Sequence, residues 1–288
     1  MQSPKHLLKW ERNNERHITK EENKMELNRQ NIDNSQSKSS ILYKYLDKEG
    51  AKKMLSCCNL QFTNATKLND PFDCHPSLID FSKVPPEKCK SWPKEVIELV
   101  ESDQYKRYRE NAWICCLSKV FDSLLMWSYY NSHKGVCIGL NMEKVAKYLN
   151  TSHGMMVANS GYEVQYRDII KKPDYFRDMT DIFHYQMFTK GIDWKHEKEV
   201  RLFILKPSPR YMTLPYQSED PNEIIDRKEM RVYPKIGKEC FESIYLGVNI
   251  DKNDRENIIE IAKKINPDIK IYQMKINPNA FQLDANPI

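Results

Sequence analysis

The chain has 288 residues, of which 40% are hydrophobic, and its 45 basic and 40 acidic side chains give a net charge of +5. This length can bury a sizeable core without disulfide or metal staples, and the mild, well-mixed charge permits contact with a nucleotide or nucleic acid without requiring it. No run of about 18 apolar residues occurs, which excludes a membrane-spanning helix, and the first residues lack the features of a secretory signal. We therefore expect a cytoplasmic protein.

The numbers and spacing of the glycines and cysteines exclude further classes of protein. Only 8 glycines occur, and neither a Gly-x-Gly-x-x-Gly motif nor a Walker-type phosphate loop is present, which argues against dinucleotide-binding Rossmann folds and phosphate-loop NTPases. The 8 cysteines include no Cys-x-x-Cys pair. We expect reduced thiols and no structural zinc site.

The chain divides into a polar arm and a folded part. Residues 1–40 hold few apolar side chains, end in a Ser/Asn-rich stretch and place like charges such as Glu11 and Glu15 one helical turn apart. Like charges at this spacing destabilise a helix, so we predict a disordered or loosely helical arm over 1–40. Residues 41–288 are predicted to form a single domain.

The predicted elements begin with an apolar and aromatic strand over 41–46, followed by a helix with Asp47 as its N-cap. Short strands mixed with helices, without regular alternation, predict an α+β fold with a mixed, mostly antiparallel sheet and flanking helices. Further helices are predicted over 94–110, 123–131, 143–148, 174–190 and 253–265, and further strands over 60–63, 112–117, 135–140, 162–166, 199–205, 231–233, 244–247 and 269–276.

The strand after Trp194 carries the most informative polar group. In an extended segment, side chains two residues apart share a face, so Glu197, Glu199 and Arg201 are expected on one side of it. Two carboxylates and a guanidinium can stabilise a cationic transition state or bind a sugar hydroxyl. The alternative is a solvated strand edge with a salt-bridge ladder.

A second polar group lies in the loop over 65–75. Pro71 forces Asp70 out of the α region, which predicts a fixed turn that presents Asn69, Asp70 and Asp73. Oxygen ligands around such a turn can hold a divalent metal, and with Glu197 and Glu199 they would form a nuclease-like acidic site. The alternative is a simple capping turn.

Aromatic side chains and one cysteine complete the candidates. Cys137 lies between two glycines, as in a nucleophile elbow, but its apolar strand indicates a small buried side chain. Lys44 alternates with two tyrosines, so it points away from both and can face a phosphate. Aromatic residues that can stack a nicotinamide or adenine ring, or pack in the core, are Tyr43, Tyr45, Trp127, Tyr129, Tyr130 and Trp194.

The order of short segments matters more than any one of them. The chain has Leu-Tyr-Lys-Tyr at 42–45, Leu-Asn-Asp-Pro-Phe-Asp at 68–73, Met-Trp-Ser-Tyr-Tyr at 126–130 leading to Gly-Val-Cys-Ile-Gly at 135–139, Trp-x-x-Glu-x-Glu-Val-Arg at 194–201 and Ile-Tyr-Leu-Gly at 244–247. In this combination it resembles the bacterial domain of unknown function family 2971, over about residues 41–276. The resemblance implies a bacterial protein from a mobile-element or phage-defence context. It implies no activity, because that of the family is not established.

A further resemblance concerns mechanism. ADP-ribosyltransferases open with a strand carrying Arg or His, continue with an aromatic or Ser-Thr-Ser element, and end with a catalytic Glu on a strand, often as Glu-x-Glu. The chain is similar in order, with Tyr43-Lys44-Tyr45, then Ser118 or the helix around Trp127 and Tyr130, then Glu197-x-Glu199. It departs from the pattern at Lys44, which stands where Arg or His is expected.

This resemblance implies NAD as a substrate. Glu199 would hold a ribose hydroxyl and stabilise the oxocarbenium-like state, Glu197 would orient the acceptor, and Arg201 would complete the catalytic group. Lys44 would contact the pyrophosphate, and Trp127 or Tyr130 would stack the nicotinamide. The NAD-binding set implied in this way is Tyr43, Lys44, Tyr45, Asn69, Asp70, Trp127 and Tyr130. The partners would be a nucleotide-type small molecule and a protein or nucleic-acid acceptor, with no membrane involved.

Two other functions stay open. One is a metal-dependent nuclease built from Asp70, Asp73, Glu197 and Glu199, which would need a divalent ion and no NAD. The other is a non-enzymatic sensor or antitoxin-like module, in which the polar strand docks a partner. The sequence therefore predicts an NAD-using ADP-ribosyltransferase-like enzyme first, and these two as alternatives.

Overall fold

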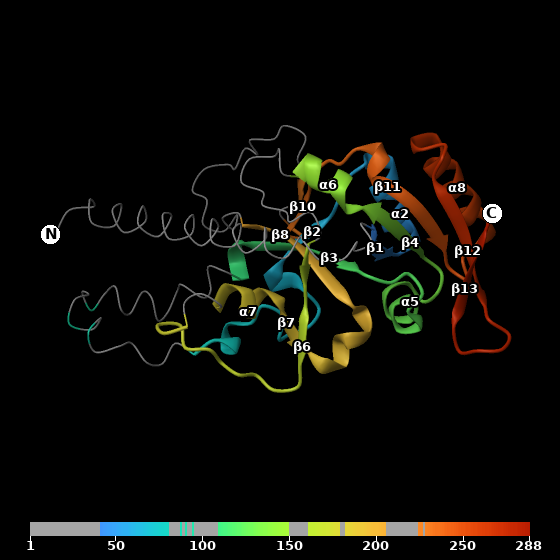
Figure 1. Ribbon diagram of the computed structural model, residues 1–288. Coiled ribbons are helices and arrows are strands. Elements are labelled where there is room, and N and C mark those ends of the chain that lie inside the picture. Colours follow the sequence, from blue (N-terminus) through green and yellow to red (C-terminus); the bar gives the residue numbers. More distant parts are fainter. Residues whose placement is uncertain are drawn as a thin grey trace. The chain divides into compact units, whose positions relative to one another are not determined.

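The structure is a computed structural model, and it describes residues 41–80, 87, 90, 94, 109–149, 161–178, 182–205, 224–226 and 228–288. One large sheet organises this part of the chain (Figure 1). In chain order its strands are β1 (Ile41–Leu46), β2 (Phe62–Asn64), β3 (Ala112–Ser118), β4 (Val136–Asn141), β5 (Tyr162–Glu163), β8 (Glu199–Leu205), β9 (Ile224–Asp226), β10 (Arg231–Tyr233), β11 (Phe241–Leu246), β12 (Lys270–Ile276) and β13 (Leu283–Pro287). The strand order is β13-β12-β11-β4-β1-β3-β2-β10-β9, with β8 paired to β3 and β5 paired to β8.

Helices and a small second sheet complete the fold. The helices are α2 (Lys48–Cys57), α5 (Leu124–Asn131), α6 (Met142–Leu149), α7 (Ile182–Phe188) and α8 (Lys252–Ile265), and the 3-10 turns are η1 (Ala65–Lys67), η2 (Pro76–Leu78), η3 (Ile192–Glu197) and η5 (Lys238–Cys240). The small sheet pairs β6 (Gln165–Arg167) with β7 (Thr189–Gly191) in parallel. In the large sheet only β11 and β12 run parallel among the described pairs. The fold is α+β with a mostly antiparallel sheet, as the sequence predicts.

Strand β3 connects the parts of the large sheet. It pairs with β8 along its whole length, from Ala112↔Leu205 to Ser118↔Glu199. Its other edge is divided: β1 meets it only at Tyr43↔Ser118, whereas β2 pairs at Thr63↔Ile114 and Asn64↔Trp113. Where β1 diverges, the ammonium group of Lys44 donates a hydrogen bond to the Cys116 carbonyl (2.8 Å), so this backbone group is not left unpaired.

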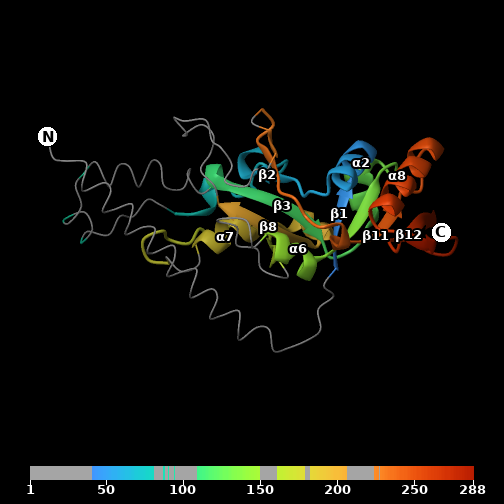
Figure 2. The same cartoon turned by 90° about the horizontal axis from the view of Figure 1, so that it is seen from above.

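The two faces of the sheet carry different cores. Leu42 faces the larger core, which α2 and α8 cover with side chains such as Leu55 and Ile258. These two helices contact each other, and Figure 2 shows them together. Tyr45 faces the opposite side, where α5 packs Trp127 against it. By register, Glu199 and Arg201 share this second face, since Ser118 and Cys116 are their partners on β3.

The register therefore places charged side chains of β8 between two apolar clusters on the α5 side of the sheet. One cluster gathers Trp127 and Tyr45 beneath α5. The other gathers Met187, Phe188 and Phe203 beside α7. A charged group between them is cut off from water and must find its partners within the protein.

Several predicted elements are confirmed. β1 and α2 have the expected bounds within a residue, and Asp47 caps α2 by accepting a hydrogen bond from the Gly50 amide. The predicted strands after 112, 135 and 199 and the helices after 123, 143 and 253 are also present. Two predictions lie mostly or wholly outside the described residues: the arm over 1–40 and the helix over 94–110.

The helix predicted over 174–190 is wrong at both described ends. Residues 174–178 form a turn, in which the Asp174 carboxylate accepts the Phe176 amide hydrogen bond. Such local acceptance by Asp competes with helix formation. At the other end the chain leaves the helix after Phe188, because Thr189–Gly191 pairs with β6. The single strand predicted over 162–166 also divides, into β5 and β6.

No helix among the described residues is long and apolar enough to cross a membrane.

The core position of Trp127 predicts a large effect on stability. Its ring is fully buried against Tyr45, and its Nε1–H donates to the Phe121 carbonyl (2.7 Å). We expect Trp127→Ala to lower the free energy of unfolding by about 3–5 kcal/mol, measured by urea denaturation. Tyr129→Ala, two residues along the same helix but 68% exposed, should change it by less than about 0.5 kcal/mol. Equal effects of the two substitutions would contradict the packing described here.

Candidate functional site

Five charged side chains meet on the α5 side of the sheet, and we call them the charged cluster. Arg201 and Glu199 come from β8, Lys190 from β7, Glu197 from the end of η3, and Asp73 from the turn before η2. None of the five is more than 5% exposed. Buried charges are costly unless they are paired, so the contacts within the cluster decide whether it stabilises the fold.

Arg201 is fully buried and binds two carboxylates. Its Nε lies 2.8 Å from Glu199 Oε1 and its Nη2 lies 3.0 Å from Glu199 Oε2, which is a bidentate pair. Nη2 also lies 2.6 Å from Asp73 Oδ1, and Nη1 donates to the Met187 carbonyl (2.7 Å). The planar guanidinium suits this arrangement because its donors point in fixed directions.

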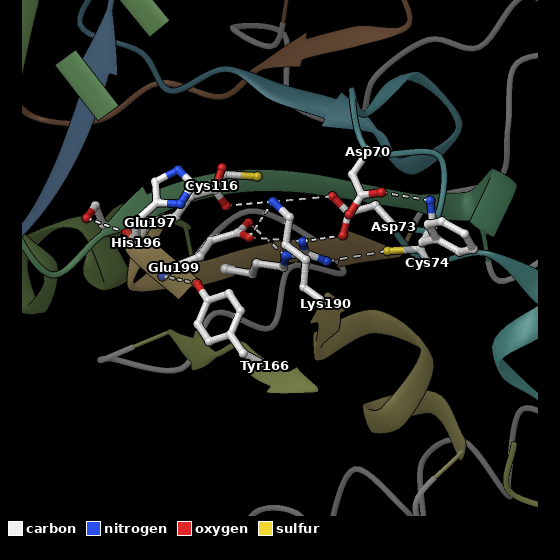
Figure 3. Close-up of polar contacts among 12 residues, drawn as sticks. Asp70, Asp73, Cys74, Cys116, Tyr166, Lys190, His196, Glu197 and Glu199 are labelled. Carbon is white, nitrogen blue, oxygen red and sulfur yellow. Dashed lines mark hydrogen bonds and ion pairs between the residues drawn. The ribbon is translucent and has the colours of Figure 1, made fainter. Parts of the chain in front are cut away.

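Lys190 joins the other carboxyl groups. Its Nζ lies 2.6 Å from Glu197 Oε2, 3.3 Å from Glu199 Oε2 and 3.6 Å from Asp73 Oδ2. Figure 3 shows Lys190 between Asp73 and the two glutamates. Its ammonium group also lies 4.6 Å from the centre of the Trp194 ring. The cation–π contact adds to the stabilisation of this buried ammonium group.

Glu197 differs from the other two acids because it is linked to the surface. Its Oε2 accepts from Lys190, while its Oε1 accepts a hydrogen bond from the hydroxyl of Tyr130 (2.5 Å). Tyr130 lies on α5 and is 38% exposed. Glu197 is therefore hydrogen-bonded to a side chain that reaches the surface.

The prediction that Glu197 lies on the strand with Glu199 and Arg201 is wrong, although the three do meet. Glu197 ends η3, and Lys198 between the glutamates adopts a left-handed conformation with φ 44°. This turn, rather than strand alternation, brings both carboxyl groups to the same side. Ser118 fixes it by donating its hydroxyl to the Glu197 carbonyl (2.7 Å).

The three acids of the charged cluster differ in pKa because their partners differ. Burial tends to raise the pKa of Glu199, but Arg201 and Lys190 outweigh it and hold that pKa far below its ordinary value. Burial prevails at Glu197 and at Asp73, where the nearby cations only partly offset the raised pKa. Glu197 and Asp73 therefore bind a proton more readily than Glu199 does.

Several aromatic rings lie near Glu197 and its partner Lys190. Tyr130 touches it directly, and Trp194 stands over Lys190. His196, the residue before Glu197, lies with its ring centre 6.2 Å from Trp194 and 5.8 Å from Tyr129. A planar ligand next to these rings would have stacking partners close to a carboxyl group.

The remaining residues predicted to bind a cofactor have other partners. Tyr43 packs on Phe121, and the Tyr45 hydroxyl donates to the Val120 carbonyl (3.0 Å). Asn69 is exposed, whereas Asp70 is buried and accepts the Phe72 amide hydrogen bond (2.9 Å), as a capping turn does. Together with Lys44 and Trp127, whose contacts are described above, they lie outside the charged cluster. Of the predicted NAD-binding set, Tyr130 contacts a carboxyl group of the cluster, and Asp70 meets Asp73 through the backbone, its carbonyl accepting the Asp73 amide hydrogen bond (3.1 Å).

Sequence reasoning missed two members of this site. Lys190 falls at the end of a segment with helical period, where nothing marks it for a buried role. Tyr166 accepts the Glu199 amide hydrogen bond through its hydroxyl (2.7 Å) and so holds the start of β8. A lone lysine and a lone tyrosine carry no spacing signal, so only the fold reveals them.

The acidic groups do not assemble as the nuclease hypothesis requires. Asp70 is used in its capping turn, and Asp73, Glu197 and Glu199 are each paired with Lys190 or Arg201. In the part of the chain that the structure describes, no group of three or more His, Cys, Asp or Glu residues is arranged to hold a metal ion. A divalent cation would have to displace one of the two basic side chains.

These observations define an α+β protein with a buried charged cluster, one of whose carboxyl groups is hydrogen-bonded to a half-exposed tyrosine. Residues 126–202 match the model of a family described as a protein of unknown function (DUF2971). The match confirms the resemblance to this family that the sequence motifs indicate, and its segment includes Tyr130, Lys190, Glu197, Glu199 and Arg201 but not Asp73. No curated protein and no solved structure matches the chain. The resemblance to ADP-ribosyltransferases stays a prediction.

The pairing of Glu199 predicts a pH-dependent stability. Its lowered pKa means that, below the ordinary value of 4.5, the unfolded chain takes up a proton that the folded chain does not, so its stabilising contribution is lost as the pH falls. Glu199→Gln should lower the free energy of unfolding by about 3–5 kcal/mol near neutral pH. The difference from the wild type should shrink towards about pH 3, measured by urea denaturation across this range.

A matched control is Glu143→Gln on α6, an exposed glutamate whose replacement should change stability by less than about 0.5 kcal/mol. A wild-type to Glu199→Gln difference that stays constant across the pH range would contradict the ionised state assigned to Glu199.

Proposed function

We propose that the protein is an enzyme that cleaves the N-glycosidic bond of NAD and transfers the ADP-ribosyl group to an acceptor. The observation that carries this proposal is the position of Glu197. Its buried carboxyl group is held by Lys190 and by the half-exposed Tyr130, in a charged cluster whose other two carboxylates are both bound by Arg201. The motif order that resembles ADP-ribosyltransferases supports NAD as the substrate.

The chemistry needs a negative charge next to the ribose. When the bond between the ribose C1′ and the nicotinamide nitrogen breaks, its electron pair leaves with nicotinamide and positive charge develops on the ribose. A fixed carboxylate beside this centre stabilises the developing charge without having to reorganise. The acceptor's lone pair then forms the new bond to C1′, and the acceptor proton is released.

In this proposal Glu197 and Glu199 exchange the roles that the motif resemblance implies. Both oxygens of Glu199 already accept hydrogen bonds from Arg201, and one also faces Lys190. Glu199 is therefore a positioning residue, which fixes Arg201 and Lys190. Glu197 is the carboxylate that faces the ribose, because its Oε1 has only the hydroxyl of the half-exposed Tyr130 as a partner among the hydrogen bonds described here.

Tyr130 would act as a placeholder. Its hydroxyl donates to Glu197 Oε1 as a ribose hydroxyl would, and a substrate could take over this hydrogen bond when the Tyr130 side chain moves outward. Such a replacement costs little, since one neutral donor takes the place of another at the same carboxylate. The displaced ring remains available to stack on the nicotinamide or adenine.

The first test follows nicotinamide release. Purified protein is incubated with NAD, with and without cell lysate as the source of acceptor, and free nicotinamide is quantified by chromatography. Glu197→Gln should lower kcat/KM by about 100-fold or more, because a fixed transition-state charge is removed. Glu143→Gln is the matched control and should retain wild-type activity, and near-UV circular dichroism checks that both variants are folded. Absence of release by the wild type with lysate present would overturn the proposal.

The second test uses Tyr130→Phe. The Tyr130 hydrogen bond lowers the pKa of Glu197, against the larger effect of burial, so its loss should raise that pKa. If Glu197 acts in its ionised form, the rising limb of the pH profile of kcat/KM should move to higher pH in the variant. KM at the optimum should fall by about 5-fold, since the substrate no longer competes with the tyrosine hydroxyl. A 100-fold fall in kcat with KM unchanged would contradict the placeholder role.

A further inference from the structure

Helix α5 presents an unusual outer face. Its sequence, Leu-Leu-Met-Trp-Ser-Tyr-Tyr-Asn, contains no charged residue. Trp127 and Met126 are buried beneath it, but Leu125 and Tyr129 on its outer side are 46% and 68% exposed. An exposed apolar and aromatic patch without charges is typical of a surface that another molecule covers.

Rings from two elements form a row on this surface, and we call it the aromatic row. Tyr129 of α5 lies with its ring centre 5.8 Å from that of His196. His196 in turn stacks on Trp194, with ring centres 6.2 Å apart and planes inclined by 29°. Both distances fall within the range over which aromatic side chains interact. Tyr129 is exposed and Trp194 and His196 are half-buried, so the row reaches the surface close to Glu197.

The charges beside the aromatic row favour an anionic partner. Within η3 and its C-cap, the exposed charged side chains are Lys195 and Lys198 against Asp193. Lys190, which also lies against Trp194, is compensated by the carboxylates of the charged cluster and does not change this balance. A protein partner chosen by apolar contact alone would not need lysines on both sides of His196, whereas a phosphate backbone does.

His196 adds a polar group without a partner. Its Nδ1 contacts the Asp193 carbonyl at 2.9 Å, but its Nε2, although shielded from solvent, has no hydrogen-bond partner among the described residues. A shielded ring nitrogen with no partner is uncommon, and such groups gain from a ligand that supplies one. A base edge or a phosphate oxygen can do so.

We propose that the aromatic row binds single-stranded nucleic acid, with bases stacked on Tyr129, His196 and Trp194 and the phosphate backbone along Lys195 and Lys198. Combined aromatic platforms and basic side chains bind single strands because every base has a flat face, whereas paired bases in a duplex are not free to stack. The row adjoins Glu197, so the bound strand would lie where the acceptor of the transferred group is needed. This acceptor role rests on the proposed function, whereas the binding itself does not.

The test measures binding without NAD. Fluorescence anisotropy of labelled oligonucleotides of about 12 nucleotides, as single-stranded DNA, single-stranded RNA and duplex DNA, is recorded with the full-length protein. We expect binding of at least one single strand and weaker binding of the duplex. Tyr129→Ala should weaken binding by about 5-fold or more, the loss of one stacked base. Lys195→Ala should weaken it and make the affinity less dependent on salt.

Two matched controls lie on α6, whose buried residues Val145 and Leu149 belong to the core on the opposite face of the sheet. Tyr148→Ala removes a second exposed tyrosine and Lys147→Ala a second exposed lysine, and neither should alter the affinity. Absence of binding, equal binding of duplex and single strand, or equal effects of the α5 and α6 variants would each overturn the proposal. A lysate protein retained by the wild type but not by Tyr129→Ala, without oligonucleotide binding, would also overturn it and assign the surface to a protein.

The outcome is independent of the NAD assay. If nicotinamide release fails while oligonucleotide binding responds to Tyr129→Ala, the proposed function is wrong and the binding surface stands. If nicotinamide is released but no oligonucleotide binds, the aromatic row is not a nucleic-acid surface, and the acceptor must be sought elsewhere.

Discussion

The described structure depends on one fully buried guanidinium. Arg201 lies in the middle of β8, where an unpaired positive charge would be prohibitive. Glu199, Asp73 and the Met187 carbonyl satisfy it, and they come from the same strand, a distant turn and α7. Lys190 then compensates the remaining acids. Because each partner is needed by another, the β8 strand, the Asp73 turn and β7 are fixed relative to one another.

The charged cluster also holds two neighbouring carboxyl groups in different environments. Glu199 is held ionised by two cations, whereas Glu197 is reached by only one and by a tyrosine hydroxyl. The same environment therefore separates their pKa values in opposite directions. Pairs of acids that are separated in this way can divide the work of structure and chemistry between them.

The sequence predicted the α+β class, the early strand and helix and most later elements, because each carries a local signal in its periodicity or its caps. It also placed Glu199 and Arg201 together, since alternation along a strand is local. It could not place Lys190, whose role depends on β7 pairing with β6, or assign Glu197 to a turn that depends on the left-handed Lys198. Tyr43, Tyr45 and Trp127 could not be divided between core and surface without the register of β1, β3 and β4.

Arg201 and its partner Asp73 lie far apart in the sequence, which limits how the protein can be divided into fragments. Asp73 and Arg201 are 128 residues apart in sequence, and Asp73 precedes the segment 126–202 that matches the family model. A fragment with the boundaries of that segment would contain both cations and two of the three acids, and it would expose the edge of β8 that pairs with β3. We therefore expect that the segment matched by the family model does not fold alone, and that a stable fragment reaches back at least to the turn before η2.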